Sequence, residues 1–399
     1  ASSASRAACC AGSVENSELP SAKSMLIGID ASRAVATYRT GTENYALHLI
    51  RELLAVGGEH RFRLYFRQAP PAGLFPPGAE ERVIPFPRLW THVALSREML
   101  AHPPDLLFVP SHVLPLARPR RSVVTVHDLG YHYHPEAHTA WQNVYLRWST
   151  RHNARSATRV LADSEATRRD LVNYYHTPPD RIAVVYPGRD ETLAPVSDPA
   201  LLAGVRARYG LEGPYLLYVG TLQPRKNLVR LVQAFSRLPA LLAGQEQPPH
   251  LPGLVLAGMK GWLHDEIVSQ VRALGLEGQV LLPGYVPEDD LPALLSGALA
   301  FVFPSLYEGF GLPVLEAMAC GTPVICSNTS SLPEVAGDAA LLVDPHDVES
   351  LARAMLRLLM NGHLRSELAA RGLEQARRFS WRRCARETLA VLEAAAGAG

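Results

Sequence analysis

The stretch Phe303-Pro-Ser-Leu-Tyr-Glu-Gly-Phe-Gly-Leu-Pro-Val-Leu-Glu-Ala-Met-Ala-Cys-Gly-Thr-Pro323 predicts a strand, a glycine-containing loop and a helix, in that order. The apolar run from Ala298 to Phe303 is typical of a strand buried on both faces. Pro313 suits the first turn of a helix, and Gly321 suits the position just past its end. Because similar strand-like runs alternate with helical patterns along the chain, we predict a mainly parallel α/β fold.

The loop in this stretch has features of a phosphate site. Gly309 and Gly311 allow the backbone to come close to a ligand, and the free N–H groups and positive dipole end of the following helix favour an anion. Glu308 and Glu316 lie eight positions apart around this turn, and carboxylates accept hydrogen bonds from hydroxyl groups. A ligand with phosphate and several hydroxyls is a nucleotide sugar. The alternative is a tight turn with two solvated glutamates.

A second segment favours the phosphate interpretation. The buried-strand pattern from Pro214 to Gly220 runs into Thr221-Leu-Gln-Pro-Arg-Lys-Asn227, which sets Arg225 and Lys226 between a strand end and a helix start. In an open parallel sheet ligands bind outside the carboxyl ends of the strands, where both loops would lie. Two merely solvated cations would not explain positive charge where the helix dipole disfavours it.

These two segments together resemble the family 4 retaining glycosyltransferases. The resemblance is strongest from about Tyr215 to Pro345 and looser in the amino-terminal half. It also includes the motifs Leu282–Pro287, Ser331–Val335, Gly28–Ser32, Gly41–Tyr45, Val126–Asp128 and Ala162–Ser164. The resemblance implies the GT-B fold, in which two Rossmann-like domains face each other across a cleft. The second domain would bind the donor and the first the acceptor.

We expect four parts along the 399 residues: a flexible leader (1–24), an acceptor-binding domain (25–190), a nucleotide-sugar-binding domain (200–380) and a helix (381–399) that crosses back to the first domain. The boundary follows the strand-like run that ends at Tyr186, in a polar stretch with prolines. The proline-rich segment from Pro70 to Pro87 is interpreted as an irregular loop.

Composition excludes several classes. The net charge of +1 gives no basic field for nucleic acid. Five cysteines show neither a disulfide framework nor zinc spacing, which indicates a reducing cytoplasm. The longest apolar stretch falls short of the ~20 residues of a membrane helix. The basic clusters Arg118–Arg121 and Arg168–Arg169 could contact an anionic acceptor or the inner face of a membrane, although solvation alone would also explain them.

By resemblance, each site residue has an expected role. Glu316 would bind the ribose hydroxyls, Glu308 the donor sugar, and backbone near Tyr285 the base. His127, which follows a predicted strand, would contact donor sugar or acceptor. The expected catalytic residues are His127, Arg225, Lys226 and Glu308. The expected donor-binding residues are Gly41, Thr42, Gly220, Thr221, Tyr285, Val286, Gly309, Phe310, Gly311, Leu312 and Glu316.

One position departs from the family pattern, because Thr221 stands where members commonly carry an arginine. Arg225 is the expected substitute. No Asp-x-Asp motif occurs, so we expect catalysis without a metal or a cofactor, the diphosphate being stabilised by cations and backbone N–H groups. His132, His134 and His138 suggest a metal site, but Pro135 prevents a simple helical pair and no constellation completes it.

The sequence therefore predicts a retaining hexosyltransferase that uses a nucleotide-diphosphate sugar, with GDP-mannose favoured over UDP-sugars. Its acceptor would be a hydroxyl of a glycan, a lipid-linked compound or a small molecule. Retention in the family is attributed to acceptor attack on the face from which the leaving group departs. The alternatives are a sugar-nucleotide epimerase, for which we identify no acid and base set, and a non-catalytic nucleotide-sugar-binding protein. A pyridoxal-dependent phosphorylase is structurally related but much longer.

Overall fold

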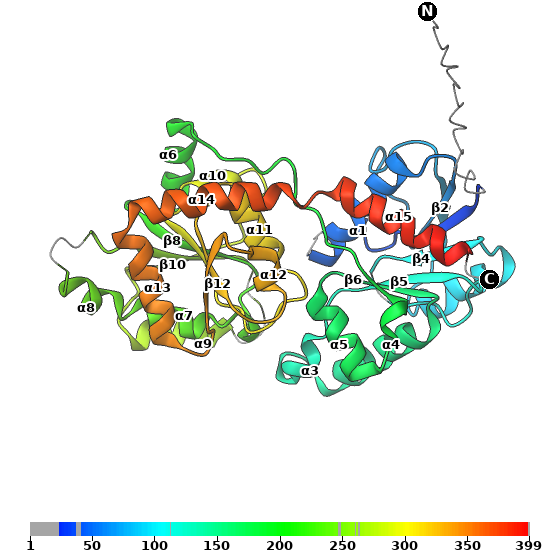
Figure 1. The fold of residues 1–399 in the computed structure, drawn as a ribbon, viewed down its shortest axis with the longest axis horizontal. Helices are drawn as coiled ribbons and strands as arrows, with labels where there is room; N and C mark the ends of the chain where they lie inside the picture. The colour runs from blue at the N-terminus through cyan, green and yellow to red at the C-terminus, as the bar shows by residue number, and fades with distance from the viewer. Residues whose placement is uncertain are drawn as a thin grey trace, which may run out of the picture.

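Two parallel sheets lie side by side, each with helices on its faces (Figure 1). The structure is a computed structural model that describes residues 24–36, 41–111, 113–245, 249–259, 261 and 264–397. Within these residues every strand pairing is parallel. The expected parallel α/β architecture with two Rossmann-like sheets is confirmed.

The first sheet is built from the amino-terminal half of the chain. Its strand order is β3 (Glu80–Val83), β2 (Arg61–Phe66), β1 (Leu26–Asp30), β4 (Leu106–Val109), β5 (Ser122–Val126), β6 (Arg159–Ala162) and β7 (Ile182–Val184). The accompanying helices and turns are α1 (Gly41–Val56), η1 (Thr91–Leu95), α2 (Ser96–Ala101), α3 (Gly130–Tyr133), η2 (Pro135–Ala137), α4 (Ala140–Ser156), α5 (Glu165–Tyr175) and η3 (Pro179–Arg181).

Alternate residues of these strands face two different hydrophobic cores. Phe108 packs in the core with α1, whereas its neighbours Leu107 and Val109 pack in the core that includes Leu171 of α5. This alternation follows from the period of two in a strand. The central strands are buried on both faces, as their continuous apolar runs predict.

The interpretation of Pro70 to Pro87 as an irregular loop was wrong in part. Glu80–Val83 forms β3, which pairs with β2 at the edge of the first sheet. All four residues of β3 are exposed. Since this edge strand buries neither face, its sequence carries none of the apolar pattern that marked the central strands.

The second sheet is built from the carboxyl-terminal half. Its strand order is β10 (Val280–Gly284), β9 (Gly253–Ala257), β8 (Tyr215–Val219), β11 (Ala300–Phe303), β12 (Val324–Ser327) and β13 (Ala340–Val343). Its helices and turn are α6 (Pro199–Arg208), η4 (Pro224–Lys226), α7 (Leu228–Phe235), α8 (Leu238–Ala243), α9 (His264–Ala273), α10 (Leu291–Ser296), α11 (Leu312–Ala319), α12 (Leu332–Ala336), α13 (Val348–Met360) and α14 (Gly362–Arg377).

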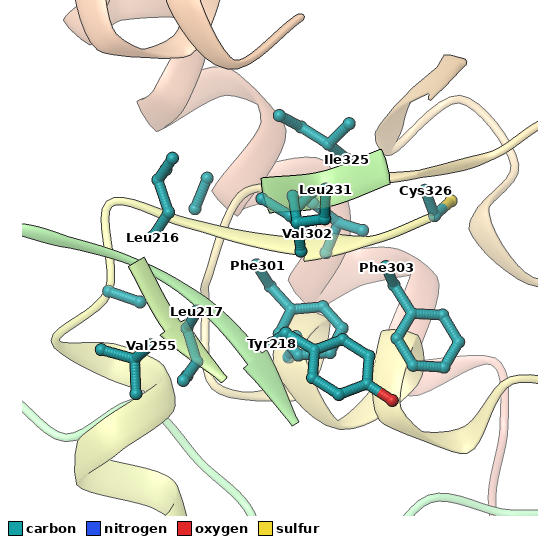
Figure 2. Packing of buried hydrophobic residues seen from close by; sticks show 14 of the residues in the cluster. Leu216, Leu217, Tyr218, Leu231, Val255, Phe301, Val302, Phe303, Ile325 and Cys326 are labelled. Carbon is teal, nitrogen blue, oxygen red and sulfur yellow. The ribbon is translucent and has the colours of Figure 1, made fainter. Parts of the chain in front are cut away.

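Large apolar side chains fill the core of the second sheet (Figure 2). Tyr218 and Phe303 stack with ring centroids 5.7 Å apart, which joins β8 to β11 at their carboxyl ends. β8 and β11 are neighbours although four α-helices and two strands separate them in the sequence, so the strand order reverses between them. A reversal of this kind creates a crevice at the strand ends where α/β proteins bind ligands.

The chain passes between the two sheets at two adjacent places. The first passage follows β7, and the second leads from α14 to α15 (Trp381–Gly397), which lies against α1 over the first sheet (Figure 1). Arg189 and Ser380 form a parallel bridge where the passages meet. A Cβ atom on Gly188 would lie 2.1 Å from the backbone nitrogen of Trp381, so only glycine permits this approach. None of the helices in the described ranges is long and apolar enough to span a bilayer.

Candidate active site

Three charged side chains meet at the crevice between β8 and β11. The Nζ atom of Lys226 lies 2.5 Å from Oε1 of Glu308, and a guanidinium nitrogen of Arg225 lies 3.0 Å from Oε2. Ser305 donates a hydrogen bond of 2.5 Å to Oε1. Glu308 and Lys226 are 7% and 8% exposed, so this is a desolvated ion cluster rather than a set of solvated charges.

Burial and the two cations pull the pKa of Glu308 in opposite directions. Burial alone would raise it, but Arg225 and Lys226 together lower the pKa of Glu308 to about 2. Burial lowers the pKa of Lys226 from its usual value, against the opposing influence of Glu308. With Glu308 ionised, the three groups carry a net charge of about +1, so part of the positive charge expected for phosphate is already compensated within the protein.

Arg225 also fastens the loop that carries Glu308. Its guanidinium donates to the carbonyl oxygen of Tyr307, and its own carbonyl oxygen accepts from the N–H of Leu306 at 2.9 Å. Lys226 lies over the ring of Phe303, with Nζ 4.9 Å from the ring centroid (Figure 2 shows this ring). The cations are therefore held in position by the strand end and the loop around them.

Gly309 and Gly311 of the loop are each required for a different structural reason. Gly311 adopts a φ of +112°, a conformation that favours glycine, directly before α11 begins at Leu312. A Cβ atom on Gly309 would lie 2.1 Å from the carbonyl oxygen of His127 in the first domain. Gly309 is thus needed because the two domains come into contact at this point.

Glu316 lies in α11 and is partly buried. Among the described residues no side chain or backbone group makes a hydrogen bond or ion pair with its carboxylate. Burial, and then the nearby carboxylates of Asp190 and Glu288, raise the pKa of Glu316 to about 7. This carboxylate is available to accept hydrogen bonds from ligand hydroxyls.

A cavity opens between the two domains next to the ion cluster. Its volume is ≈ 330 Å³, and Thr42, His127 and Asp128 of the first domain line it together with Arg225 of the second. At the start of α1, a Cβ atom on Gly41 would lie 4.0 Å from the side chain of Leu312. The structure therefore brings the expected residues of the first domain to the crevice of the second.

His127 is oriented by a residue to which the sequence assigned no role. Its Nδ1 lies 2.6 Å from Oδ2 of Asp163, at the end of β6, the neighbour of β5. Burial would lower the pKa of His127, but the Asp163 carboxylate outweighs this and raises it. Asp128, the residue after His127, binds backbone: its Oδ1 accepts the N–H of Gly130 at 2.9 Å.

Comparisons with known proteins agree with this architecture. Residues 39–193 match the model of Glycosyltransferase Family 4, and residues 206–375 match that of Glycosyl transferases group 1. The chain is 40% identical over 281 residues to the O-antigen chain mannosyltransferase B of Escherichia coli, covering 70% of this chain and 72% of that protein. The chain belongs to glycosyltransferase family 4.

Solved structures show the same fold. The sucrose-phosphate synthase of Thermosynechococcus elongatus superposes with a TM-score of 0.71 at 22% identity, covering 92% of this chain and 98% of that one. Anabaena HepE in complex with UDP and glucose gives a TM-score of 0.70 at 17% identity, covering 92% and 98%. The expected GT-B fold is therefore confirmed, and the protein is a hexosyltransferase of family 4.

The remaining expected donor residues of this glycosyltransferase lie around the crevice in different settings. Tyr285, in the loop after β10, is 61% exposed, and Val286 beside it is buried. Phe310 packs between Tyr186 and Phe379, with ring centroids 6.1 and 5.7 Å away, so its backbone and not its ring is available to a donor.

Gly220 and Thr221 follow β8 directly, and the carbonyl oxygen of Thr221 accepts a hydrogen bond of 3.1 Å from the hydroxyl of Tyr218. Thr221 contributes no charge where the family commonly has an arginine. Arg225, the expected substitute, pairs with Glu308 and lines the cavity.

Two of the histidines that suggested a metal site in the sequence bind other side chains of this protein. His132 hydrogen-bonds the hydroxyl of Tyr175 at 2.9 Å, and His134 pairs with Glu136. Within the described parts of the chain, no group of three or more histidine, cysteine or acidic residues is arranged to hold a metal ion.

Proposed function

We propose that this glycosyltransferase transfers mannose, with retention of configuration and without a metal, from GDP-mannose to a hydroxyl group of an acceptor. The observation that carries the proposal is the buried cluster of Arg225, Lys226 and Glu308 opposite His127 across the cavity. Its fixed cations would stabilise the charge that grows on the departing diphosphate. Mannose is proposed because a relative that is 40% identical is named as a mannosyltransferase.

A panel of nucleotide sugars tests the donor. GDP-mannose should raise the melting temperature more than UDP-glucose, UDP-galactose or UDP-N-acetylglucosamine at the same concentration, since a ligand that binds only the folded state stabilises it. Release of free GDP on addition of an acceptor should follow. A larger rise in melting temperature with a UDP-sugar, together with UDP release, would favour the alternative of a UDP-sugar transferase. The structure of HepE with UDP and glucose is a precedent for UDP binding in this fold.

The ion cluster bears on how the configuration would be retained. A covalent intermediate on Glu308 would require a nucleophilic carboxylate, but both of its oxygens are engaged by cations and Ser305. A carboxylate whose pKa is about 2 is a weak nucleophile. We therefore favour attack by the acceptor on the face from which the diphosphate leaves. Proton NMR of the first product should show the anomeric configuration of the donor, and an inverted product would contradict this mechanism.

Metal independence is proposed from the same cluster. The buried Lys226, the partly buried Arg225 and the start of α11 can serve the role that a divalent ion has in other transferases. We expect initial rates of transfer to be unchanged in EDTA. Loss of transfer in EDTA that Mg²⁺ or Mn²⁺ restores would refute this part of the proposal.

Two other functions would use the same donor site. An epimerase would convert the donor without an acceptor, and a non-catalytic protein would only bind it. Product analysis without and with acceptor separates the three functions. An epimerase would give epimerised nucleotide sugar, a binding protein would leave the nucleotide sugar unchanged, and a transferase would give free GDP and a glycosylated acceptor. Among the residues that the structure describes, we identify no acid and base pair that would favour the epimerase, and the Nδ1 atom of His127 is already bonded to Asp163.

Helix α4 supports a lipid-linked acceptor presented at a membrane surface. Trp141, Val144 and Trp148 recur along one face of this helix and are 80%, 57% and 43% exposed. The same face continues with Arg151 and Arg155, and α4 contains no acidic residue. Exposed tryptophans beside arginines are typical of helices that lie at an anionic lipid interface.

The opposite face of α4 lines the cavity with Thr150 and Asn153, so a glycan could reach the site from a membrane on which α4 rests. Cosedimentation with phosphatidylglycerol vesicles tests this proposal. The variant Trp141→Ala/Trp148→Ala should lose binding, and Leu201→Ala, which removes an exposed apolar side chain from the second domain, should not. Equal binding of all three proteins, or binding to phosphatidylcholine alone, would contradict the proposed surface.

A further inference from the structure

The first turn of α5 is capped by a residue of the other domain. One oxygen of Glu334, in α12, accepts the backbone N–H of Glu165 at 2.9 Å, and the other accepts that of Ala166 at 3.0 Å. Such first-turn N–H groups have no acceptor within their own helix, and a carboxylate also complements the helix dipole. The start of α5, in the first domain, is thus fixed by the second.

The segment that carries these N–H groups also holds His127. Asp163, just before the helix, pairs with the His127 ring at 2.6 Å. The hydroxyl of Thr167, in the first turn, lies 3.2 Å from the carbonyl oxygen of His127 and 3.4 Å from that of Gly309. Residues 163–167 therefore contact His127 on one side and Glu334 on the other.

A second contact between the domains lies one turn further along α5. Asp170 accepts hydrogen bonds of 2.6 Å from the hydroxyls of Tyr307 and Tyr133. Asp170 and Tyr307 are 5% and 4% exposed. Because Tyr307 directly precedes Glu308, α5 is joined to the loop that holds the ion cluster as well as to α12.

We propose that Glu334 is a positioning residue for the transfer reaction: by capping α5 across the domain boundary, it sets His127 and the 307–309 loop in the relative position that transfer needs. The proposal rests on the proposed function in so far as His127 and Glu308 serve transfer. Glu334 does not line the cavity, so its effect on the reaction would pass through α5.

The test compares Glu334→Ala, which removes both acceptors, with Glu334→Gln, which puts an NH2 donor in place of one of the two acceptor oxygens. Tyr186→Phe is the matched control, because the Tyr186 hydroxyl donates to the same carboxylate at 3.0 Å, and its loss leaves both bonds between Glu334 and α5 in place. Misplacing a reacting group by about 1 Å can cost about 100-fold in rate. We expect kcat to fall about 10- to 100-fold in Glu334→Ala and less in Glu334→Gln, with a donor KM within about threefold of the parent.

Hydrogen exchange provides a readout that does not depend on the donor or the acceptor. Amide exchange of a peptide covering residues 163–170 should be faster in Glu334→Ala, intermediate in Glu334→Gln and unchanged in Tyr186→Phe. If the parent transfers no sugar from any donor, the proposed function fails, but faster exchange would still support the cap. Should Glu334→Ala not fold, Glu334→Gln carries the test.

Two results would overturn the proposal. The first is unchanged exchange and kcat in a folded Glu334→Ala or Glu334→Gln variant. The second is an equal loss of kcat in Tyr186→Phe, because that would assign the effect to the surroundings of Glu334 rather than to its bonds with α5.

Discussion

Replacing Lys226 by alanine tests the assignment of the ion cluster most directly. Lys226 should stabilise the transition state more than the bound donor, because negative charge on the diphosphate grows as the bond to the sugar breaks. Losing one preorganised donor of this kind costs about 10²- to 10³-fold, so we expect kcat/KM to fall by at least about 10²-fold.

The same change also removes an ion pair, and its effect on folding must be separated from its effect on catalysis. At the 2.5 Å between Lys226 and Glu308, the Coulomb attraction is about 7 kcal/mol at an effective dielectric constant of about 20, and desolvation offsets most of it. Removing one partner of a buried pair commonly costs about 3–5 kcal/mol. Arg225 and Ser305 still bind Glu308 in the variant, so we expect a loss of stability below about 3 kcal/mol.

The assay is GDP release at saturating acceptor, with urea unfolding of each variant as the control for folding. Lys226→Arg should recover little activity, because the lysine is 8% exposed and lies between Glu308 and the Phe303 ring, where a guanidinium fork does not fit in the same place. Arg225→Ala should be about as harmful as Lys226→Ala if Arg225 replaces the arginine absent at Thr221. A folded Lys226→Ala enzyme with near-normal kcat/KM would mean that the diphosphate binds elsewhere.

Three further predictions concern the neighbouring residues. Glu316→Ala should weaken binding of both GDP-mannose and GDP, whereas Glu308→Ala should not weaken GDP binding, since it removes a negative charge beside Arg225 and Lys226. Isothermal titration calorimetry that shows equal loss of GDP binding in both variants would contradict the assigned roles. The pKa of Glu316 is raised from 4.5 to about 7, so between these pH values the native state binds a proton that the unfolded state has released. The stability of the wild-type protein should therefore fall as pH rises from 4.5 to 7. The variant Glu316→Gln should be more stable than wild type at pH 8 but not at pH 4. A similar difference at both pH values would exclude this linkage. Gly309→Ala should reduce kcat/KM by about 10²-fold and spare GDP affinity, because the added Cβ would lie 2.1 Å from the His127 carbonyl oxygen and force the domains apart. Wild-type kinetics in this variant would show that the close contact between Gly309 and His127 is not needed.

The sequence predicted the buried parts of the fold well, because continuous apolar strands and helix-end signals are local. β11 is shorter than the predicted run, starting at Ala300 rather than Ala298, but Pro313 and Gly321 lie at the start and just past the end of α11 as expected. β3 was missed because its residues are exposed at a sheet edge. Local pattern identifies an element only where one of its faces is buried.

Roles within the site were harder to predict than the residues themselves. Arg225, Lys226 and Glu308 carried clear local signals, but their mutual pairing depends on β8 and β11 being neighbours, which joins positions more than 80 apart in the sequence. Asp163 and Glu334 fell within motifs of the resemblance without an assigned role. Each acquires its role only through a contact with another strand or the other domain.

The pairing changes how the charge of the site should be understood. Since Glu308 compensates one of the two cations, Arg225 and Lys226 alone cannot balance a departing diphosphate. The start of α11 adds backbone N–H groups, and His127, whose pKa is raised by Asp163, adds a group that can carry positive charge on the opposite wall. These contributions come from different domains and combine only while Gly309 is held against His127. Charge stabilisation and contact between the domains would therefore depend on each other, and α5 is the element where the two requirements meet.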